Sequence, residues 1–331
     1  MPDFHTLTST AQFNSIQKDH IHGALSDRLE AYKQLQSGKK FEKPSDDPIA
    51  WHEADMIRAD MGKFRTFSYG VREALGSVGD SISNIDEIRK ELESAVTKAQ
   101  MGSNSTMSQE SRHVLASEIE TIQRSIVAFG NRADRHGDYL FAGKATTSDS
   151  ITKNVNELEA AIPMGNNNPY AGLNDKTKPF ALNGNELVYL GTSDTRTFRV
   201  GPGNDYEAFT AVPATGDSLV KAYNNLEELK NNLRNGNVDL IAESHEKLQK
   251  DAKTFRSIKY AIGDNGEELS NLKEQYDSLL YKKESDLSDT EDVNSAEAVM
   301  KFRESGEALQ RAYTSTAAMN KFNLLDFING S

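Results

Sequence analysis

The side chains best suited to bind a metal are seven histidines, and the chain has no cysteine to add to them. A metal site on a helix needs imidazoles on one side, as in the His-Glu-x-x-His pattern, which does not occur. His20 and His22 are two residues apart, so they point to different sides of a helix. The histidines therefore predict no metal site, and we expect solvated or half-packed imidazoles.

Adjacent carboxylates at Asp46 and Asp47 could serve as a general acid and base. The following Pro48 favours a different role, because the residue before a proline is pushed out of the helical region and proline suits the first helical position. We therefore expect Asp47-Pro48 to begin a helix. Gly201-x-Gly203 lacks the third glycine of a dinucleotide fingerprint, and no Gly-x-Ser-x-Gly occurs. The sequence predicts no catalytic residue, no cofactor and no enzyme activity.

The elements around these residues are predicted to be long helices. Proline is absent from 49 to 162 and from 214 to 331, and a proline in a helix interior costs about 3 kcal/mol. Apolar residues recur every seven positions in both stretches, which is typical of a coiled-coil seam. The second series keeps its phase across Gly263 and Gly266, so we expect one helix from about 238 to 287. The two series are Ala50, Ile57, Phe64, Val71, Val78, Ile85, Leu92 and Ala99, and Ile241, Leu248, Phe255, Ile262, Leu269 and Tyr276.

The pattern changes between about 146 and 217, where turn sequences alternate with short strand-like runs such as 187–190 and 197–200. We expect a small β-rich domain that projects from the helices. The predicted fold class is mainly α: an elongated antiparallel helical bundle or coiled coil formed by both chain ends, with that β-rich domain inserted in the middle. The predicted domains are 1–40 with 288–331, 41–145 with 218–287, and 146–217.

The two chain ends have weak apolar stripes that polar residues interrupt. An amphipathic helix with such a stripe is marginal alone in water, so each end needs a partner helix. Two alternatives remain open: the ends pair only with each other, or they become ordered when identical copies stack. The candidate subunit-packing residues are Leu7, Ile21, Leu25, Tyr32 and Leu35 at one end, and Leu309, Tyr313, Leu324, Leu325 and Phe327 at the other.

The charge balance argues against a nucleic-acid partner. The net charge is −12, the longest basic run is Lys39-Lys40, and no basic stripe with interleaved aromatic residues occurs. No apolar run approaches the length of a bilayer span, so we expect no membrane insertion. The first residues lack the charged-then-apolar pattern of a secretory signal, which by itself favours a cytoplasmic protein.

Two stretches are more specific than periodicity. The run Ser37-Gly38-Lys39-Lys40, followed by Pro44-Ser45-Asp46-Asp47-Pro48, resembles the amino-terminal signature of the flagellin superfamily, in which one helix ends at Ser-Gly-Lys and another begins at Ser-Asp-Asp-Pro. Gly38 suits a helix C-cap, and the two lysines suit the negative end of that helix.

The second stretch resembles the Gly-x-Tyr-Leu-Phe-x-Gly element of the hook-associated protein 3 branch of that superfamily. It consists of Gly137, Tyr139, Leu140, Phe141 and Gly143 with the residues between them. Runs at 179–180 and 188–191 resemble the β-rich insertion of that branch, and runs at 309–312 and 324–327 resemble its carboxyl terminus.

The resemblance implies a structural subunit at the junction between the hook and the filament of the bacterial flagellum. Such a protein is exported by the flagellar type III apparatus without a cleaved signal peptide, and is extracellular. Its implied partners are itself in a homo-oligomeric ring, another hook-associated protein, flagellin and a cytoplasmic export chaperone. The alternatives are a short flagellin that forms the filament itself and an intracellular coiled-coil adaptor.

Overall fold

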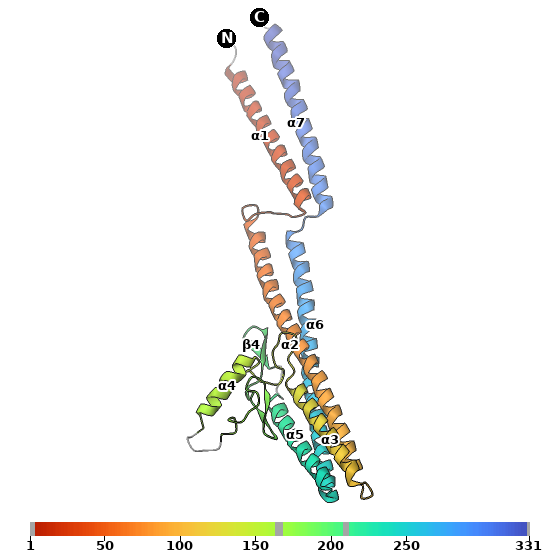
Figure 1. The fold of residues 1–331 in the computed structure, drawn as a ribbon. Helices are drawn as coiled ribbons and strands as arrows, with labels where there is room; N and C mark the ends of the chain where they lie inside the picture. Colours follow the sequence, from red (N-terminus) through yellow and green to blue (C-terminus); the bar gives the residue numbers. More distant parts are fainter. Residues whose placement is uncertain (1–3, 163–167, 208–211, 330–331) are drawn as a thin grey trace. The chain divides into compact units, whose positions relative to one another are not determined.

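The computed structural model describes residues 4–162, 168–207 and 212–329. The chain divides into two compact units, which we call the terminal unit, residues 1–63 with 279–331, and the central unit, residues 64–278. Helices dominate both units, and the strands form two small antiparallel sheets, which confirms the mainly α fold class (Figure 1). The expected division into three domains stays a prediction.

Along the described part of the chain, the four strands follow one another between α4 and α5, and all other elements are helices. Two helices, α2 and α6, have residues in both units. The elements are α1 (Phe4–Ser37), α2 (Pro48–Gly102), α3 (Gln109–Gly130), α4 (Ser148–Ala160), β1 (Phe180–Asn183), β2 (Glu186–Tyr189), β3 (Thr197–Gly201), β4 (Asn204–Glu207), α5 (Val212–Asn235), α6 (Val238–Glu291) and α7 (Ser295–Asn329).

The core of the central unit is built by α2, α3, α5 and α6, and the predicted heptad positions fill it. Val71, Ile85, Leu92 and Ala99 of α2 are completely buried, as are the α6 positions from Ile241 to Leu269 in the predicted series. Gly263 and Gly266 lie inside α6, which confirms the prediction of one helix across both glycines; it ends at Glu291, a few residues beyond the predicted 287. Side chains of this size fill a continuous interior, so this unit has a core of its own.

One buried acid interrupts this apolar core. Asp251 of α6 is 4% exposed, and its carboxylate accepts a hydrogen bond of 2.6 Å from the side-chain amide of Asn225 on α5. Burial raises the pKa of Asp251, and the Asn225 hydrogen bond and the charge of Lys221 oppose that rise. A polar contact of this kind fixes the register of α5 against α6 because only one pairing satisfies it.

The segment from 146 to 217 contains two hairpins, β1–β2 and β3–β4, which turn at Gly184 with φ +62° and at Gly203 with φ +75°. It also contains a helix, α4, which the turn-rich sequence did not predict. The segment is less separate than expected, because Phe180, Leu187 and Val200 belong to the same apolar core as the helices.

The β3–β4 hairpin contacts the helices through its backbone. A β-carbon on Gly70 of α2 would lie 2.1 Å from the carbonyl oxygen of Arg199, so the strand passes against a notch that only glycine provides. On the other side, the Tyr276 hydroxyl of α6 donates a 2.5 Å hydrogen bond to the carbonyl oxygen of Val200. These contacts fix the hairpin to two helices at once.

Candidate assembly site on the terminal helices

In the terminal unit, α1 and α7 lie side by side (Figure 1) and meet along a seam of mostly small side chains. Ala31 is 2% exposed, and Ser305 and Leu309 are 7% and 9% exposed. Further along the seam, the Gln17 side-chain amide donates to the Ser315 hydroxyl at 3.2 Å. A seam of small side chains removes little apolar surface from water, so it stabilises the pair weakly.

A second feature of α1 is an apolar stripe that this pairing leaves uncovered. It consists of Ile21, Leu25, Leu29 and Tyr32, whose spacing places them on one side of the helix. Leu25, Leu29 and Tyr32 are 49%, 54% and 52% exposed, and Ile21 is half-buried. Tyr32 approaches α7, with its ring centroid 6.4 Å from that of Phe302. We call these four residues the α1 stripe.

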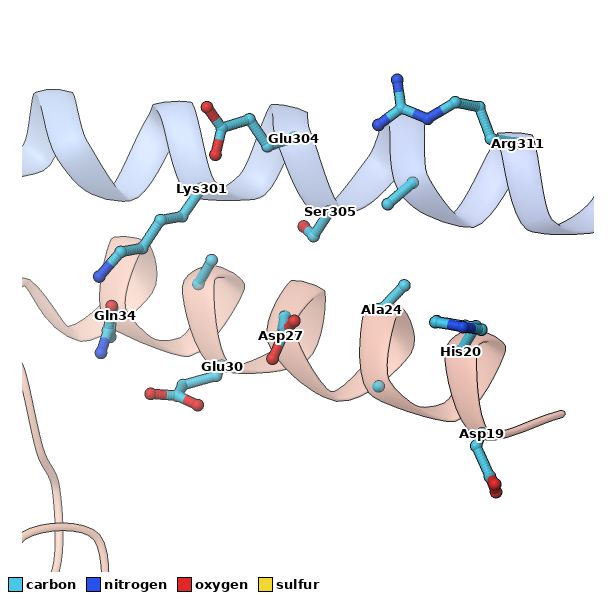
Figure 2. Close-up of a pocket in the computed structure, with 13 residues that line it drawn as sticks. Asp19, His20, Ala24, Asp27, Glu30, Gln34, Lys301, Glu304, Ser305 and Arg311 are labelled. Atoms are coloured by element: carbon cyan, nitrogen blue, oxygen red, sulfur yellow. The ribbon is translucent and has the colours of Figure 1, made fainter. Parts of the chain in front are cut away.

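A polar groove between α1 and α7 offers a different surface (Figure 2). Ala24 of α1 and Ser305 of α7 point into the space between the helices, while Glu304 and Arg311 point away from it. The α1 side of the groove carries acidic residues at Asp19, Asp27 and Glu30, and the α7 side carries Lys301, Glu304 and Arg311. The groove is therefore charged, whereas the α1 stripe is apolar.

The structure places the predicted subunit-packing residues in different surroundings. Leu25 and Tyr32 lie in the α1 stripe, and Tyr313 of α7 is also exposed, at 55%. Leu35 is half-buried, and Leu309 is buried in the seam of its own chain. The side chains of the remaining predicted residues, which sit inside α1 and α7, lie outside the described part of the structure: Leu7, Leu324, Leu325 and Phe327.

The predicted helix-junction motif forms the connection between α1 and α2. Ser37 is the last residue of α1, and Gly38 follows it at φ +71° and donates its backbone amide to the Gln34 carbonyl at 2.9 Å. This is the left-handed cap that glycine adopts without strain. The Ser37 hydroxyl accepts a 3.2 Å hydrogen bond from the Lys39 amide, which holds the chain as it leaves the helix.

At the other end of the connection, the two adjacent carboxylates bind backbone amides on opposite sides. Asp46 accepts hydrogen bonds of 3.2 Å from the amides of Glu42 and Lys43, and so closes the turn before it. Asp47 accepts from the amides of Ile49 and Ala50 at 3.1 and 3.0 Å, and so caps α2, whose first residue is Pro48. Ser45 is exposed in the turn. Each acid therefore has a structural contact.

The same connection crosses the one between α6 and α7. The Lys40 amide donates to the Glu291 carbonyl at 2.6 Å, and the Val293 amide donates to the Gly38 carbonyl at 2.9 Å, so that residues 38–40 and 291–293 run antiparallel. The Glu291 carboxylate, with 2% of its side chain exposed, pairs with both Lys39 and Arg58. We call this arrangement the crossing.

The crossing gives the basic pair that follows α1 partners that the sequence did not indicate. Lys39 pairs with Glu291, and the Lys40 ammonium donates to the Asp289 carbonyl in the last turn of α6. The side chains of the two lysines therefore contact the end of α6. Sequence reasoning also missed Glu291 and Arg58, because nothing local marks an acid whose partners lie 252 and 233 positions away.

The second predicted motif lies in the central unit, between α3 and α4. Leu140 and Phe141 are buried in the core, at 3% and 0% exposed. Gly143 has φ +67°, and a β-carbon there would lie 2.4 Å from the Thr192 carbonyl oxygen. The Tyr139 amide donates to the Thr146 carbonyl at 2.7 Å, and Gly137 makes the turn before it at φ +85°. The motif thus connects the helical core to the strands.

A partly buried cluster of Arg196 with two aspartates holds that motif in place. Arg196 donates to Asp134 at 3.0 Å and to Asp138 at 2.9 Å. Burial acts to raise the pKa of Asp134, but hydrogen bonds from Arg196 and from the backbone amides of His136 and Asp138 outweigh it and lower the pKa. These contacts are structural, and we assign the motif no binding role.

Membrane spans and metal clusters are both absent from residues 4–162, 168–207 and 212–329. Over those ranges, every helix falls short of the length and apolar character that a bilayer crossing needs. No three histidine, aspartate or glutamate side chains of the described residues gather in a way that could hold a metal ion.

Comparison with known proteins identifies the amino-terminal part of the chain. Residues 9–146 match the bacterial flagellin N-terminal helical region. Two proteins called flagellar hook-associated protein 3 are similar over 114 residues, which is 34% of this chain: that of Escherichia coli at 28% identity and that of Salmonella typhimurium at 27%. The matched segment covers 36% of the length of each relative, about a third.

Solved structures show the same fold over a larger part of the chain. A candidate flagellar hook-associated protein from Vibrio parahaemolyticus superposes with a TM-score of 0.59 at 15% identity, covering 75% of this chain and 100% of its own. FlgL of Xanthomonas campestris gives 0.53 at 12% identity, covering 71% and 98%. The chain therefore shares the fold of these solved structures, and its amino-terminal part is similar to the bacterial flagellin N-terminal helical region and to flagellar hook-associated protein 3.

Proposed function

We propose that the protein is a structural subunit of the bacterial flagellum. In this role it forms the junction between the hook, which it contacts through another hook-associated protein, and the filament. Copies of the chain assemble as a ring through α1 and α7, and the protein catalyses no reaction.

The observation that carries this proposal is the α1 stripe on a helix that already has a partner. Pairing with α7 leaves Leu25, Leu29 and Tyr32 about half exposed. Full burial of a large apolar side chain contributes about 1.5–3 kcal/mol, so covering the exposed half of each contributes roughly 1 kcal/mol. A neighbouring copy that covers the stripe gains this free energy.

The relatives support a place in the flagellum. The matched region, 9–146, contains nearly all of α1 and the whole connection to α2. Two proteins similar to this chain in that region are called flagellar hook-associated protein 3, and we propose the same role for this chain. Export through the flagellar type III apparatus, with a cytoplasmic chaperone, belongs to the same proposal and explains an extracellular location.

The test is complementation of a strain from which the gene is deleted. The proposal expects hooks without filaments and flagellin in the medium. The wild-type gene restores filaments, whereas a variant with Leu25, Leu29 and Tyr32 all changed to Ser is secreted but does not restore them. Tyr260→Ser removes a side chain that is 65% exposed on α6 of the central unit, and as a matched control it restores filaments.

Normal filaments in the deletion strain would contradict the proposal. Fractionation separates the alternatives, because a short flagellin dominates sheared filaments whereas a junction subunit is a trace component. Detection of the protein only in the cytoplasm of export-competent cells would favour an intracellular adaptor.

A further inference from the structure

Among the described residues of the terminal unit, Glu291 is the one charged side chain that is buried. Its carboxylate pairs with Lys39 and Arg58, whose side chains are 44% and 39% exposed. The acid is therefore sequestered from water while its two cations are half solvated. All three side chains meet at the crossing, where the backbones of the two connections are hydrogen-bonded.

We propose that Glu291 is an ionic latch that holds the crossing closed, and that opening the crossing releases α1 and α7 together. The proposal rests on the role of these helices in assembly, since release lets them adjust to a neighbouring copy. The two states are the closed crossing, with Glu291 buried and paired, and an open one, in which the carboxylate and both cations are hydrated.

The latch has two states because the acid is buried whereas its two cations are partly exposed. A buried carboxylate is stable only while its cationic partners are in place. A partial opening would separate Glu291 from those partners before water can reach the carboxylate or the backbone groups, so it would raise the free energy. Once the crossing opens, all three charged groups regain water, and attraction between exposed charges is weak. Intermediate positions are therefore disfavoured, as is usual for packed contacts that switch between two arrangements.

The position of the latch explains why it acts on both helices. The α1 helix ends at Ser37, immediately before residues 38–40, and α7 begins at Ser295, shortly after residues 291–293. The seam between α1 and α7 consists mostly of small side chains and adds little to their stability. The crossing is thus the contact at which each helix is joined to the rest of the terminal unit, and a change there alters both.

The experiment compares Glu291→Gln with Asp289→Asn in the purified full-length chain. Both substitutions remove one negative charge with almost no change in shape, but Asp289 has an exposed side chain. Two readouts lie at the crossing. Trypsin can cut after Lys39 and Lys40, and the only tryptophan, Trp51, lies beneath Arg58, 5.5 Å from the guanidinium to the ring centroid.

We expect Glu291→Gln to raise the rate of cleavage after Lys39 and Lys40 about tenfold or more, because the two cations lose their buried partner. The fluorescence of Trp51 shifts in the same variant, and the helix content measured by circular dichroism stays unchanged. Asp289→Asn matches the wild type in all three. Equal cleavage rates and equal emission in the two variants would overturn the latch.

Arg58→Met keeps the test valid if Glu291→Gln unfolds the terminal unit. It leaves Glu291 paired with Lys39, so we expect a smaller rise in cleavage, about threefold. The double variant, which combines Glu291→Gln with Arg58→Met, should be cut no faster than Glu291→Gln alone, because both substitutions disrupt the same ion pair. Independent, multiplicative effects would contradict the proposal. Filament assembly is not part of this assay, so failure of the flagellar role is seen separately, in the deletion strain.

Discussion

The two units of this chain bury different kinds of surface. In the central unit the interior consists of large side chains such as Ile85, Leu92 and Phe255, each completely buried. In the paired helices of the terminal unit the buried positions are Ala31, Ala298, Ser305 and Leu309, whereas larger apolar side chains such as Leu25, Leu29 and Tyr32 stay about half exposed. The central unit therefore gains its stability from its own core, whereas the terminal helices have surface left for contacts with other molecules.

The largest expected effect tests whether the central core is self-sufficient. Phe255→Ala removes a large ring from a packed interior and is expected to lower the free energy of unfolding by about 3–5 kcal/mol. Chemical denaturation followed by circular dichroism measures it. Tyr260→Ala, at an exposed position of the same helix, is the control and should change it by about 0.5 kcal/mol or less. Similar losses in both variants would show that the central unit does not depend on its buried core.

A second change tests whether the β3–β4 hairpin belongs to the central core. Gly70→Ala forces a β-carbon against the Arg199 carbonyl, so the hairpin must shift, and we expect a loss of about 1–3 kcal/mol. Gly79→Ala has open space at its β-carbon in the same helix and should instead stabilise the protein by about 1 kcal/mol. Opposite signs of the two changes in unfolding free energy would support close packing of the hairpin against α2. Equal signs would contradict that packing.

A third change concerns the buried acid of the central unit. Because burial raises the folded-state pKa of Asp251 above its ordinary value, the folded state binds more protons than the unfolded state between those two values. Its contribution to stability is therefore present below the ordinary pKa and is lost as the pH rises through the raised one. In Asp251→Asn the side chain cannot ionise, so this loss of stability at higher pH does not occur. The new side-chain amide oxygen can still accept the hydrogen bond from Asn225.

We expect Asp251→Asn to raise the free energy of unfolding at neutral pH by about 1 kcal/mol. The difference between variant and wild type should shrink as the pH falls, when measured by denaturant unfolding at several pH values. Asp239→Asn, in the first turn of α6, where its position 239 is exposed, is the control and should not follow that pattern. A difference that grows on acidification would show that Asp251 is stabilised as the anion.

The smallest effect on stability is expected at the α1 stripe. Leu25→Ala and Leu29→Ala change side chains that are about half exposed, so each should alter the unfolding free energy of the monomer by about 0.5 kcal/mol or less. Differential scanning calorimetry of the monomer measures this. A loss near that of Phe255→Ala would mean that the stripe is already covered within one chain, and would remove the main contrast between the units.

Most of the helical architecture could be predicted from the sequence, because the heptad series and the absence of proline are local signals. Positions from Val71 to Ala99 and from Ile241 to Leu269 are buried as their spacing predicts. The α4 helix was missed because its apolar residues are few, with Ile151 and Val155 as the buried pair. Its start was readable, since the Thr147 hydroxyl accepts from the Ser150 amide in the manner of an N-cap.

The candidate site was harder to predict, because its geometry depends on partners that are distant in the chain. The caps at Gly38 and Asp47 follow from residue type and neighbours alone. The pairing of Lys39 with Glu291 does not, because the two residues lie 252 positions apart in the chain. Periodicity identified Leu25 and Tyr32 as apolar positions on a helix, but it could not tell that α7 would leave them exposed.

The connection between α1 and α2 is anchored at both of its ends, by the crossing at Lys40 and by the carboxylates of Asp46 and Asp47. A segment that is hydrogen-bonded at both ends has little freedom to rotate, so we expect it to transmit a twist of α1 to the start of α2. Rotation of α1 about its own axis must either turn the start of α2 or break the bonds at residues 38–40. The connection therefore behaves mechanically as a coupling, and adding or removing a single residue within it would change the angle that it transmits.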